Sequence, residues 1–337
     1  MKKYNVGVVG VGAVGAEMVR LLEQRNFPID SLRVFGRTER EEHIADKARI
    51  VEMTTAEVFH GLDFAFFAGT EGEKGASKQF GWEAAKYDCI VIDNGDDFRM
   101  DSRVPLVIPE INPEALKGHR RFIANPNCST IIMLMALAPL HRFNKIRRIT
   151  ASTYQAVSGS GSAGVKELDR QATAWAHGHE LFHEVYPHPI LHNVIPAVGS
   201  FKSDDGESTE EIKMRKETHK ILVDDSILIS TTCVRVPVVN GHSMSLNVEF
   251  EEPMPPEQAR EILGVAPGIV LMDNPKVHFY PTPLRASGIS EVLVGRIRRD
   301  QSVAGGKGLT LFCSGDNIWK GAALNAIQIA EALIRGK

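Results

Sequence analysis

The segment YNVGVVGVGAVG, residues 4–15, decides the fold of the first part of this chain. Residues 4–9 form a short apolar run typical of a buried strand, and three glycines follow it at once. Beyond them, apolar residues recur at spacings of three and four, which predicts an amphipathic helix. A strand, a GxGxxG turn and a helix form the arrangement that brings a dinucleotide pyrophosphate close to a helix N-terminus. We therefore expect nucleotide contacts from Gly10, Gly12, Ala13, Val14 and Gly15.

Strand-like runs alternate with helix-like segments further along, at residues 31–35, 63–68 and 89–92, which predicts a parallel, doubly wound sheet. The pattern changes after Lys145, where β-branched and alternating stretches indicate an antiparallel or mixed sheet. Residues 228–236 and 243–252 are its clearest expected strands. The expected fold class is α/β, with an N-terminal doubly wound (Rossmann) domain and a second α+β domain. Expected boundaries are residues 1–127 for the first domain, completed by a C-terminal helix in 315–337, and 128–314 for the second.

Composition excludes several classes of protein. With 337 residues the chain is long enough for two domains, and its net charge of −3 offers no basic surface for nucleic acid or an anionic membrane. No apolar run reaches the roughly 18 residues of a membrane span. Four widely spaced cysteines without a CxxC pair are typical of free thiols in a reducing compartment. We therefore expect a cytoplasmic enzyme that binds neither nucleic acid nor membrane.

One of these cysteines, Cys128, stands out in the segment NPNCSTI, residues 125–131. It lies between a strand-like run and an apolar helical run, so it should sit at a helix N-terminus. There the helix dipole and unpaired N–H groups favour a thiolate, which is a nucleophile, and can stabilise an oxyanion. The alternative is a small buried core cysteine.

The cofactor can be argued from residues 34–38, VFGRT, at the end of the second expected strand. NAD-binding folds usually carry an acidic residue about 20 positions after the glycines, where it binds the ribose hydroxyls. This strand end has no acid and instead offers the guanidinium of Arg37 and the hydroxyl of Thr38, which suit a 2′-phosphate. The residues therefore favour NADP over NAD.

Seven ordered motifs spread over the chain give it a resemblance to the aspartate-semialdehyde dehydrogenase family. They are DN at 93–94 with FRM at 98–100, residues 125–131, TYQAVSG at 153–159, RVPV at 235–238 with GHS at 241–243, PTP at 281–283 with ASG at 286–288, VGRIR at 294–298, and DN at 316–317 with KGAA at 320–323. The cysteine and Gly-His-Ser motifs are the most specific of these.

The resemblance implies reductive dephosphorylation of β-aspartyl phosphate by NADPH, a step in lysine (diaminopimelate), threonine and methionine biosynthesis. Cys128 takes the place of the nucleophile that forms a thioester, which divides one difficult step into two easier ones. His242 takes the place of the general acid/base, a role that suits a pKa near neutrality. Gln155 matches the residue that positions the thioester and its oxyanion.

The resemblance also implies how substrates are bound. Arg235 matches the guanidinium that pairs with the substrate α-carboxylate, for which a planar, bidentate donor is well suited. Arg99, Asn127 and Lys213 match phosphate-site positions, and Glu210 matches the residue that faces the substrate amino group. A solvated helix face is the alternative for Glu210 and Lys213.

Further nucleotide contacts are implied for Ser158, Gly159 and Asn317, and the second domain should form a homodimer or a dimer of dimers. The chain also departs from the family pattern. Its glycine loop is one residue shorter than the usual form, and Asp96 and Asp97 replace small or hydroxyl residues near the phosphate-site arginine. Five histidines lie within residues 177–192, but without a tight ligand pair on one helix face, so we expect no metal.

Two alternatives stay open at the level of sequence. One is another acyl-phosphate or acyl-thioester reductase, such as N-acetyl-glutamyl-phosphate reductase or malonyl-CoA reductase. The former usually has Gly and Tyr beside its cysteine, where this chain has Asn127 and Ser129. The other is a catalytically silent paralogue, which should have lost its nucleophile or base, whereas Cys128 and His242 are both present.

Overall fold

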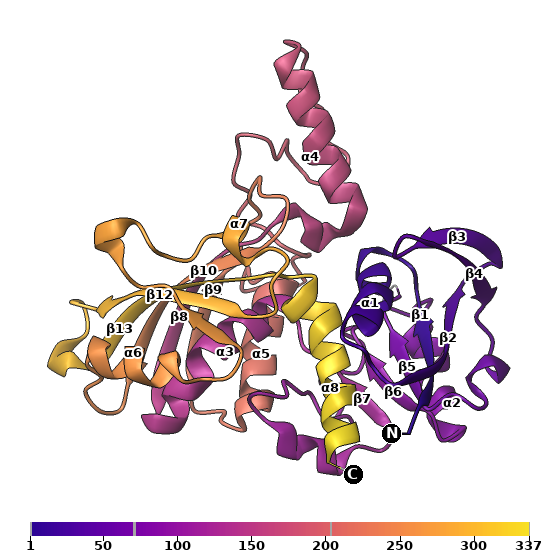
Figure 1. Cartoon of the computed structure of the whole chain (residues 1–337). Helices are drawn as coiled ribbons and strands as arrows, with labels where there is room; N and C mark the ends of the chain where they lie inside the picture. The colour runs from indigo at the N-terminus through magenta and orange to yellow at the C-terminus, as the bar shows by residue number, and fades with distance from the viewer. Residues whose placement is uncertain (1, 70–71, 203, 337) are drawn as a thin grey trace. The chain divides into compact units, whose positions relative to one another are not determined.

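The computed structural model describes residues 2–69, 72–202 and 204–336, and the chain divides into two units (Figure 1). Unit 1 comprises Met1–Asn127 and Ala322–Lys337, and unit 2 comprises Cys128–Gly321. Each unit is built around its own sheet.

Within the described residues, the sheet of unit 1 has seven strands in the order β3-β4-β2-β1-β5-β6-β7. All neighbouring strands are parallel except β3 and β4. The chain leaves β1 toward one side of the sheet and later returns to build the other side, so the predicted doubly wound fold is confirmed. The strands are β1 Tyr4–Val9, β2 Ile29–Gly36, β3 Arg40–Ile44, β4 Lys47–Met53, β5 Phe64–Phe67, β6 Ile90–Asp93 and β7 Phe122–Ala124.

The hairpin β3–β4 was not predicted from the sequence. Its two turn residues, Ala45 and Asp46, have φ values of 52° and 63°, the left-handed conformation that a two-residue hairpin turn requires. β4 pairs with β2, so the hairpin extends the sheet beside the strand that ends at Gly36. Strongly charged strands of this kind give little hydrophobic signal, which explains why the pattern was missed.

The described part of unit 1 has three α-helices: α1 Ala13–Gln24, α2 Ala76–Lys86 and α8 Leu324–Arg335. α1 follows the glycine turn directly and buries Met18, Leu21 and Leu22, as its spacing predicted, whereas Val14, expected on the same face, is only partly buried. α8 contacts α1 and β6, and its Asn325 donates to the Asn125 side chain at 2.7 Å. The C-terminal helix expected in residues 315–337 is present as α8 but begins only at Leu324, because residues 319–323 form a π-helical turn before it.

The sheet of unit 2 is mixed, with the order β11-β12-β13-β10-β8-β9 over the described part of the chain. β8 pairs parallel with β9 and β11 with β12, and the remaining pairs are antiparallel. The strands are β8 Ile146–Tyr154, β9 Leu228–Thr232, β10 His242–Phe250, β11 Ile269–Leu271, β12 Val292–Arg299 and β13 Gly308–Gly315. The expected antiparallel or mixed sheet is therefore confirmed.

The strand expected over residues 228–236 ends at Thr232. Beyond it the backbone turns to other partners, since Cys233 N donates to Glu211 Oε1 at 2.9 Å and Val234 N donates to Thr153 Oγ1 at 3.1 Å. Arg235 then pairs with Ile195 in an isolated antiparallel bridge. The prediction was too long because β-branched composition reports strand preference and cannot show where the pairing partner ends.

Helices α3, α5 and α6 contact the sheet of unit 2, whereas α4 extends away from it (Figure 1). α3 is apolar nearly all round and buries residues 129–138, as befits a helix enclosed on every side. Its bounds and those of the other helices are α3 Cys128–Phe143, α4 Gly161–Ala176, α5 Thr209–Leu222, α6 Pro256–Gly264 and α7 Pro283–Ala286, with a short 3₁₀ turn, η3, at Val157–Ser160. None of the helices in the described ranges is long and apolar enough to span a bilayer.

Candidate active site

The glycine loop of unit 1 depends on residues without side chains. Gly10 has a φ of 97°, and a Cβ there would lie 2.8 Å from the backbone of Ala68. A Cβ on Gly15 would lie 1.8 Å from the carbonyl oxygen of Gly10, so α1 can begin against the loop only because Gly15 lacks one. Gly12 is the N-cap of α1, and a Cβ built there would have no neighbour within 4 Å. The loop therefore fits a group that approaches the backbone at the helix N-terminus.

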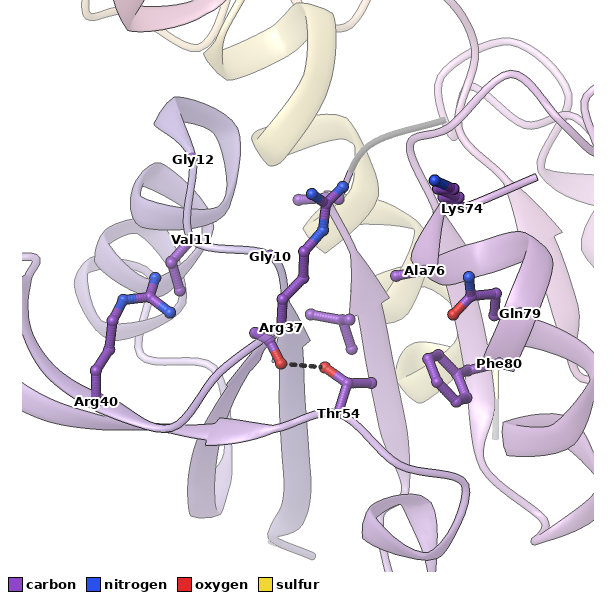
Figure 2. Close-up of a pocket in the computed structure, with 14 residues that line it drawn as sticks. Gly10, Val11, Gly12, Arg37, Arg40, Thr54, Lys74, Ala76, Gln79 and Phe80 are labelled. Carbon is purple, nitrogen blue, oxygen red and sulfur yellow. Dashed lines mark hydrogen bonds between the residues drawn. The ribbon is translucent and has the colours of Figure 1, made fainter. Parts of the chain in front are cut away.

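A cavity of about 560 Å³ lies beside this loop (Figure 2). Gly10 and Gly12 line it together with three cationic side chains, Arg37, Arg40 and Lys74. Figure 2 shows the Arg37 side chain extending into the cavity, next to the bond from Thr54 Oγ1 to Gly36 O at 3.0 Å. These cations make the cavity suitable for a phosphorylated ligand.

The other predicted nucleotide residues of unit 1 have different surroundings. Thr38 is not among the residues that line the cavity, and its carbonyl accepts from Arg40 Nη1 at 3.1 Å. Ala13, Val14 and Gly15 form the first turn of α1. Arg40 was not predicted, because no residue pattern indicated that a hairpin would bring β3 back to the end of β2.

Two predicted phosphate-site residues, Arg99 and Asn127, also belong to unit 1 and are nearly buried. Arg99 donates from Nε to Asn125 O at 3.0 Å and from Nη2 to Asn94 O at 2.6 Å, so these two asparagine carbonyls fix the guanidinium. The Asp97 carboxylate accepts from the backbone N–H of Gly72 at 3.0 Å. Of the two acidic residues that replace small or hydroxyl residues near Arg99, Asp96 and Asp97, at least Asp97 thus bonds the backbone of another segment.

In unit 2, Cys128 is the first residue of α3, the position that the sequence predicted. Its side chain is partly exposed, and a Cβ on Gly321 would lie 2.8 Å from the Cys128 Cβ. Gly321 therefore has to be glycine for Cys128 to occupy this place. The sequence contained Gly321 in the KGAA motif, but nothing in the motif indicated contact with the cysteine.

The remaining three cysteines differ from Cys128 in exposure. Cys89, Cys233 and Cys313 are all buried, and none of the four cysteines forms a disulfide. Burial raises the pKa of Cys89 and of Cys313 to about 12, and it also raises the pKa of Cys233. A thiol that stays protonated is a poor nucleophile, so Cys128 is the cysteine suited to covalent chemistry.

One peptide segment, residues 155–159, organises the rest of the site. The backbone N–H of Ala156 donates to His242 Nδ1 at 3.0 Å, and its carbonyl accepts from Arg235 Nη1 at 2.6 Å. A Cβ on Gly159 would lie 2.7 Å from Arg235 Nη1 and 3.2 Å from His242 Nε2. The guanidinium and the imidazole therefore flank the same glycine, although Gly159 was predicted as a nucleotide contact. The role of Ala156 was not predicted, because a backbone contact leaves no trace in residue type.

His242 is completely buried at the start of β10. Because Nδ1 accepts a hydrogen bond from a backbone N–H, the neutral ring carries its proton on Nε2. That atom has no hydrogen-bond partner among the residues that the structure describes. Burial, followed by the charge of Arg235, lowers the pKa of His242 well below its usual value. The sequence-based expectation of a near-neutral pKa is therefore wrong for the free protein.

The first turn of α3 packs beside His242. His242 pairs with Gly315 across β10 and β13, and a Cβ on Gly315 would lie 2.8 Å from Ile132 Cγ1. Ile132 is one helical turn after Cys128, so it lies on the same face of α3. The nucleophile position and the imidazole thus belong to adjoining elements of one unit.

Gln155 and Glu210, predicted from distant motifs, are in direct contact. Gln155 Nε2 donates to Glu210 Oε1 at 3.1 Å, and Gln155 Oε1 accepts from Thr153 Oγ1 at 3.0 Å. Both residues are nearly buried, which removes the alternative of a solvated helix face for Glu210. Lys213 is partly buried one turn further along α5, so it lies on the same side of the helix.

Ser158 and Asn317, predicted as nucleotide contacts, bind one another. Asn317 Nδ2 donates to Ser158 Oγ at 2.9 Å, and Asn317 Oδ1 accepts from Gly241 N at 2.9 Å. The neighbouring Asp316 accepts from the Asn240 side chain at 2.8 Å. These bonds hold the turn at residues 240–241 that leads into His242.

The histidine-rich segment shows only pairwise ring contacts, such as 6.1 Å between the ring centres of His177 and His179. Within the described ranges, no group of three or more His, Cys, Asp or Glu side chains is arranged to hold a metal ion. His183 Nδ1 lies 2.9 Å from the Tyr186 carbonyl, so one ring nitrogen already bonds the backbone.

Comparison with known proteins identifies the family. A family profile described as semialdehyde dehydrogenase, NAD binding domain, matches residues 5–119, and one described as semialdehyde dehydrogenase, dimerisation domain, matches residues 137–320. The aspartate-semialdehyde dehydrogenase of Aquifex aeolicus is 42% identical over 340 residues, which cover 98% of both chains. That of Mycolicibacterium smegmatis is 44% identical over 350 residues, again covering 98% of each.

Solved structures that resemble this chain carry the same family name as these relatives. Aspartate semialdehyde dehydrogenase II from Vibrio cholerae matches with a TM-score of 0.93 and 40% identity, covering 99% of both chains. A structure of that protein complexed with ASA matches with a TM-score of 0.92 and 39% identity, with the same coverage. The resemblance drawn from the sequence motifs is thus confirmed: the chain belongs to the aspartate-semialdehyde dehydrogenase family.

Proposed function

We propose that this protein catalyses the NADPH-dependent reductive dephosphorylation of β-aspartyl phosphate to aspartate semialdehyde, a step in lysine, threonine and methionine biosynthesis. The observation that carries the proposal is that Arg235 and His242 are both bonded to the backbone of one residue, Ala156, while the buried Nε2 of His242 lacks a partner within the described residues. A buried polar atom of this kind is costly unless a ligand satisfies it.

In the proposed mechanism, the Cys128 thiolate attacks the carbonyl carbon of the acyl phosphate. The bond to the phosphate oxygen breaks, phosphate leaves, and a thioester to Cys128 remains. A hydride from bound NADPH would add to the carbonyl carbon of this thioester and give the anion of a thiohemiacetal. Cleavage of the carbon–sulfur bond of that anion would then release the aldehyde and regenerate the Cys128 thiolate.

His242 would act on the reacting oxygen through Nε2. Because Nδ1 is bonded to Ala156, Nε2 is the ring atom that can donate to the oxygen as negative charge develops on it. Gln155 would position the same carbonyl group, with its own amide fixed by Thr153 and Glu210. Charge stabilisation by a group that is already oriented costs no reorganisation during the reaction.

Recognition of the substrate would fall to charged side chains. The Arg235 guanidinium would pair with the α-carboxylate, and Glu210 would face the amino group, since each is nearly buried and oriented by hydrogen bonds. Arg99, Asn127 and Lys213 are the proposed phosphate ligands. These assignments extend the family resemblance, and each can be tested by the KM of the corresponding variant.

We propose NADP as the preferred nicotinamide cofactor. Arg37 at the end of β2 lines the cavity, and Arg40 and Lys74 add positive charge to the same space. Among the described residues that line this cavity there is no carboxylate, whereas an acid usually binds the ribose hydroxyls in NAD-binding folds. Ser158, Gly159 and Asn317 remain proposed nucleotide contacts from unit 2.

We also propose that the protein is a cytoplasmic homodimer, or a dimer of dimers. Support comes from free cysteines and from exposed apolar side chains on adjacent strands of the second sheet, where Tyr154 is 41% and Leu228 66% exposed. Apolar side chains in such positions are typical of surfaces that bind another protein chain. Light scattering coupled to gel filtration measures the oligomer directly.

The reaction itself is tested by following NADP reduction with aspartate semialdehyde and phosphate, beside the same assay with acetylated glutamate semialdehyde. We expect turnover with the first substrate that depends on phosphate, and little with the second. Preference for the acetylated substrate would instead favour N-acetyl-glutamyl-phosphate reductase. Absence of turnover with both would favour a catalytically silent paralogue.

A further inference from the structure

Helix α4 buries two polar side chains on the face where an amphipathic helix normally places apolar ones. Glu167 is 3% exposed and Gln171 is fully buried one turn later. Burial of a carboxyl or amide group costs free energy unless hydrogen bonds replace those made to water. The partners of these two side chains therefore indicate what the helix face is for.

Both side chains bind the backbone of residues 182–191, which we call the strap. Glu167 Oε2 accepts two bonds at 2.8 and 2.5 Å, Gln171 Oε1 accepts two at 3.0 and 2.9 Å, and Gln171 Nε2 donates one at 2.7 Å. The backbone groups involved are the N–H of Glu184, Val185, Ile190 and Leu191 and the carbonyl of Phe182. The strap contains no helix or strand, so its backbone lacks the regular hydrogen bonds of those structures. The Glu167 and Gln171 side chains supply hydrogen bonds in their place.

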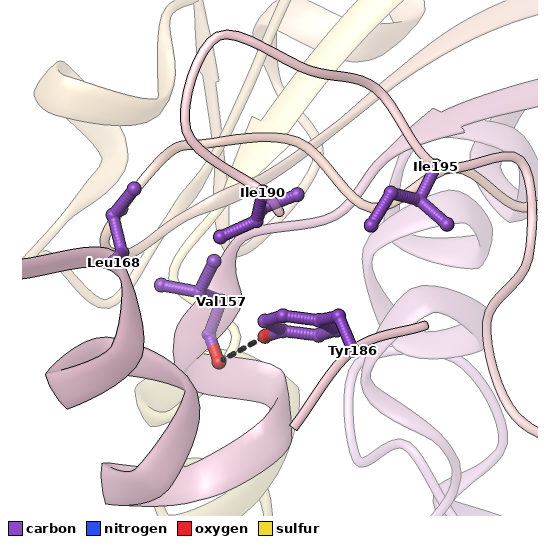
Figure 3. Packing of buried hydrophobic residues seen from close by; sticks show 5 residues of the cluster. All are labelled: Val157, Leu168, Tyr186, Ile190 and Ile195. Atoms are coloured by element: carbon purple, nitrogen blue, oxygen red, sulfur yellow. Dashed lines mark hydrogen bonds between the residues drawn. The ribbon is translucent and has the colours of Figure 1, made fainter. Parts of the chain in front are cut away.

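The strap in turn packs against the segment that organises the active site (Figure 3). Tyr186 and Ile190 from the strap form a buried cluster with Val157, Leu168 and Ile195. The Tyr186 hydroxyl donates to the Val157 carbonyl at 3.4 Å, as Figure 3 shows. Val157 begins η3, the turn whose Gly159 flanks Arg235 and His242.

A second connection reaches Arg235 directly. Ile195, just beyond the strap, donates from its N–H to Arg235 O at 2.9 Å and accepts from Arg235 N at 2.8 Å. Both backbone groups of Arg235 are thus bonded to the segment that follows the strap. The next residue, Val236, is bonded to the active-site segment, since its N–H donates to the Gln155 carbonyl at 3.0 Å. The position of Arg235 therefore depends on where the strap lies.

We propose that Glu167 and Gln171 are positioning residues for substrate recognition. They fix the strap on α4, and the strap fixes both the Arg235 backbone and the 157–159 turn against which the guanidinium rests. Neither side chain acts on the substrate; each acts through Arg235. This inference rests on the proposed role of Arg235 in binding the substrate carboxylate.

The test is Glu167→Gln, which keeps the side-chain size but replaces one acceptor oxygen by an NH₂ group. That NH₂ group then faces either the strap N–H groups or the Gln171 amide, and two donors cannot bond one another. The attachment of the strap to α4 is therefore weakened, but no cavity is created. We expect the KM for aspartate semialdehyde to rise about tenfold while kcat changes less than about twofold. Gln171→Asn, which shortens the reach by one methylene, should have the same effect and serves if Glu167→Gln does not fold.

The matched control is Asp300→Asn. Asp300 is another nearly buried carboxylate of unit 2 that accepts from a backbone N–H, that of Ser302 at 2.9 Å, but its bonds lie at the far end of β10 with Asn247. A loss of folding stability alone should lower the Tm of both variants without raising the KM of either. An unchanged KM in Glu167→Gln, or an equal rise in Asp300→Asn, overturns the proposal.

A double-mutant cycle with Arg235→Lys separates this proposal from the proposed function. If Glu167 acts through Arg235, the double variant should have a KM little above that of Arg235→Lys alone, because the two effects share one path. Effects that multiply overturn the positioning role. Failure of the proposed function looks different, since Arg235→Lys by itself would then keep the wild-type KM.

Discussion

The nucleotide loop of unit 1 and the Cys128–His242 site of unit 2 use the chain differently. In the loop, one short segment with three glycines, residues 10–15, forms the proposed site, and what matters is the absence of side chains at Gly10 and Gly15. In unit 2, the proposed site consists of side chains from separate segments, and the backbone of one residue, Ala156, is bonded to two of them. A site made of backbone tolerates changes in its neighbours, whereas a site made of linked side chains should fail when any link is altered.

The largest effect is expected for Cys128→Ser. A serine hydroxyl lacks the acidity of a thiol, so kcat should fall by about 10⁴–10⁶, as for removal of other nucleophiles. NADP affinity, measured by fluorescence titration, should stay nearly unchanged because the glycine loop belongs to the other unit. A serine variant that keeps a tenth of the wild-type activity would show that no covalent step occurs.

Labelling with iodoacetamide at pH 7 provides the matching control on the wild-type protein. Cys128 should react rapidly and alone, and substrate should slow the reaction, because the other three thiols are buried and their pKa values are raised. Equally slow reaction of all four thiols would contradict an activated Cys128.

His242→Ala should have the second largest effect, a fall in kcat of about 10²–10⁴. The pH profile refines this prediction. Since burial and Arg235 lower the pKa of His242 well below 6.5, the free protein keeps the ring neutral at pH 7 and protonates it only in more acidic solution. The kcat/KM profile, which reports the free enzyme, should therefore lose activity on its acid side only at pH values well below 6.5, and the alanine variant should lack that limb. A His242-dependent limb between pH 6.5 and 8 would contradict the structure.

Residue patterns predicted the parts of both sites that depend on local sequence. The strand–glycine–helix segment is encoded within about twenty residues, and its strand bounds, Tyr4–Val9, agree with the expectation. Cys128 at the first position of α3 is equally local. Such features can be predicted from the sequence because hydrophobic periodicity and the placement of glycines determine structure over a few residues.

Features that depend on tertiary contact were not predictable in this way. The β3–β4 hairpin places Arg40 beside the cavity only after β4 pairs with β2. The pKa of His242 depends on burial beneath segments far away in sequence, and a strand preference cannot reveal that β9 ends at Thr232. Strand propensity depends on the local sequence, whereas the burial of a side chain and the pairing of strands depend on contacts made in the folded chain.

Gly321→Ala tests whether a missing side chain matters in unit 2 as it does in unit 1. The new Cβ would lie 2.8 Å from the Cys128 Cβ and 3.3 Å from its Cα, so the cysteine must move. A displacement of the reacting atom by about 1 Å can cost about 10²-fold in rate, and we expect a loss of that order in kcat. Gly264→Ala is the control, because a Cβ there meets no atom within 4 Å. Wild-type kcat and labelling rate in Gly321→Ala would refute the steric argument.

The smallest expected effect is that of Arg37→Ala, which tests the one charged side chain that the sequence assigned to the cavity. Loss of a charge-assisted contact to the 2′-phosphate should cost about 1.5–3 kcal/mol, or roughly 10- to 150-fold in NADP affinity. NAD lacks that phosphate, so its affinity should change little, and the labelling rate of Cys128 should not change because the chemistry of unit 2 does not involve Arg37.

Arg40→Ala is the paired variant, since Arg40 lines the same cavity but is also bonded to Glu42 at 2.8 Å and to the Thr38 carbonyl. We expect the Arg40 change to weaken NADP less than the Arg37 change does. Equal weakening of NADP and NAD in Arg37→Ala would mean that Arg37 supports the fold of the loop and does not recognise the phosphate.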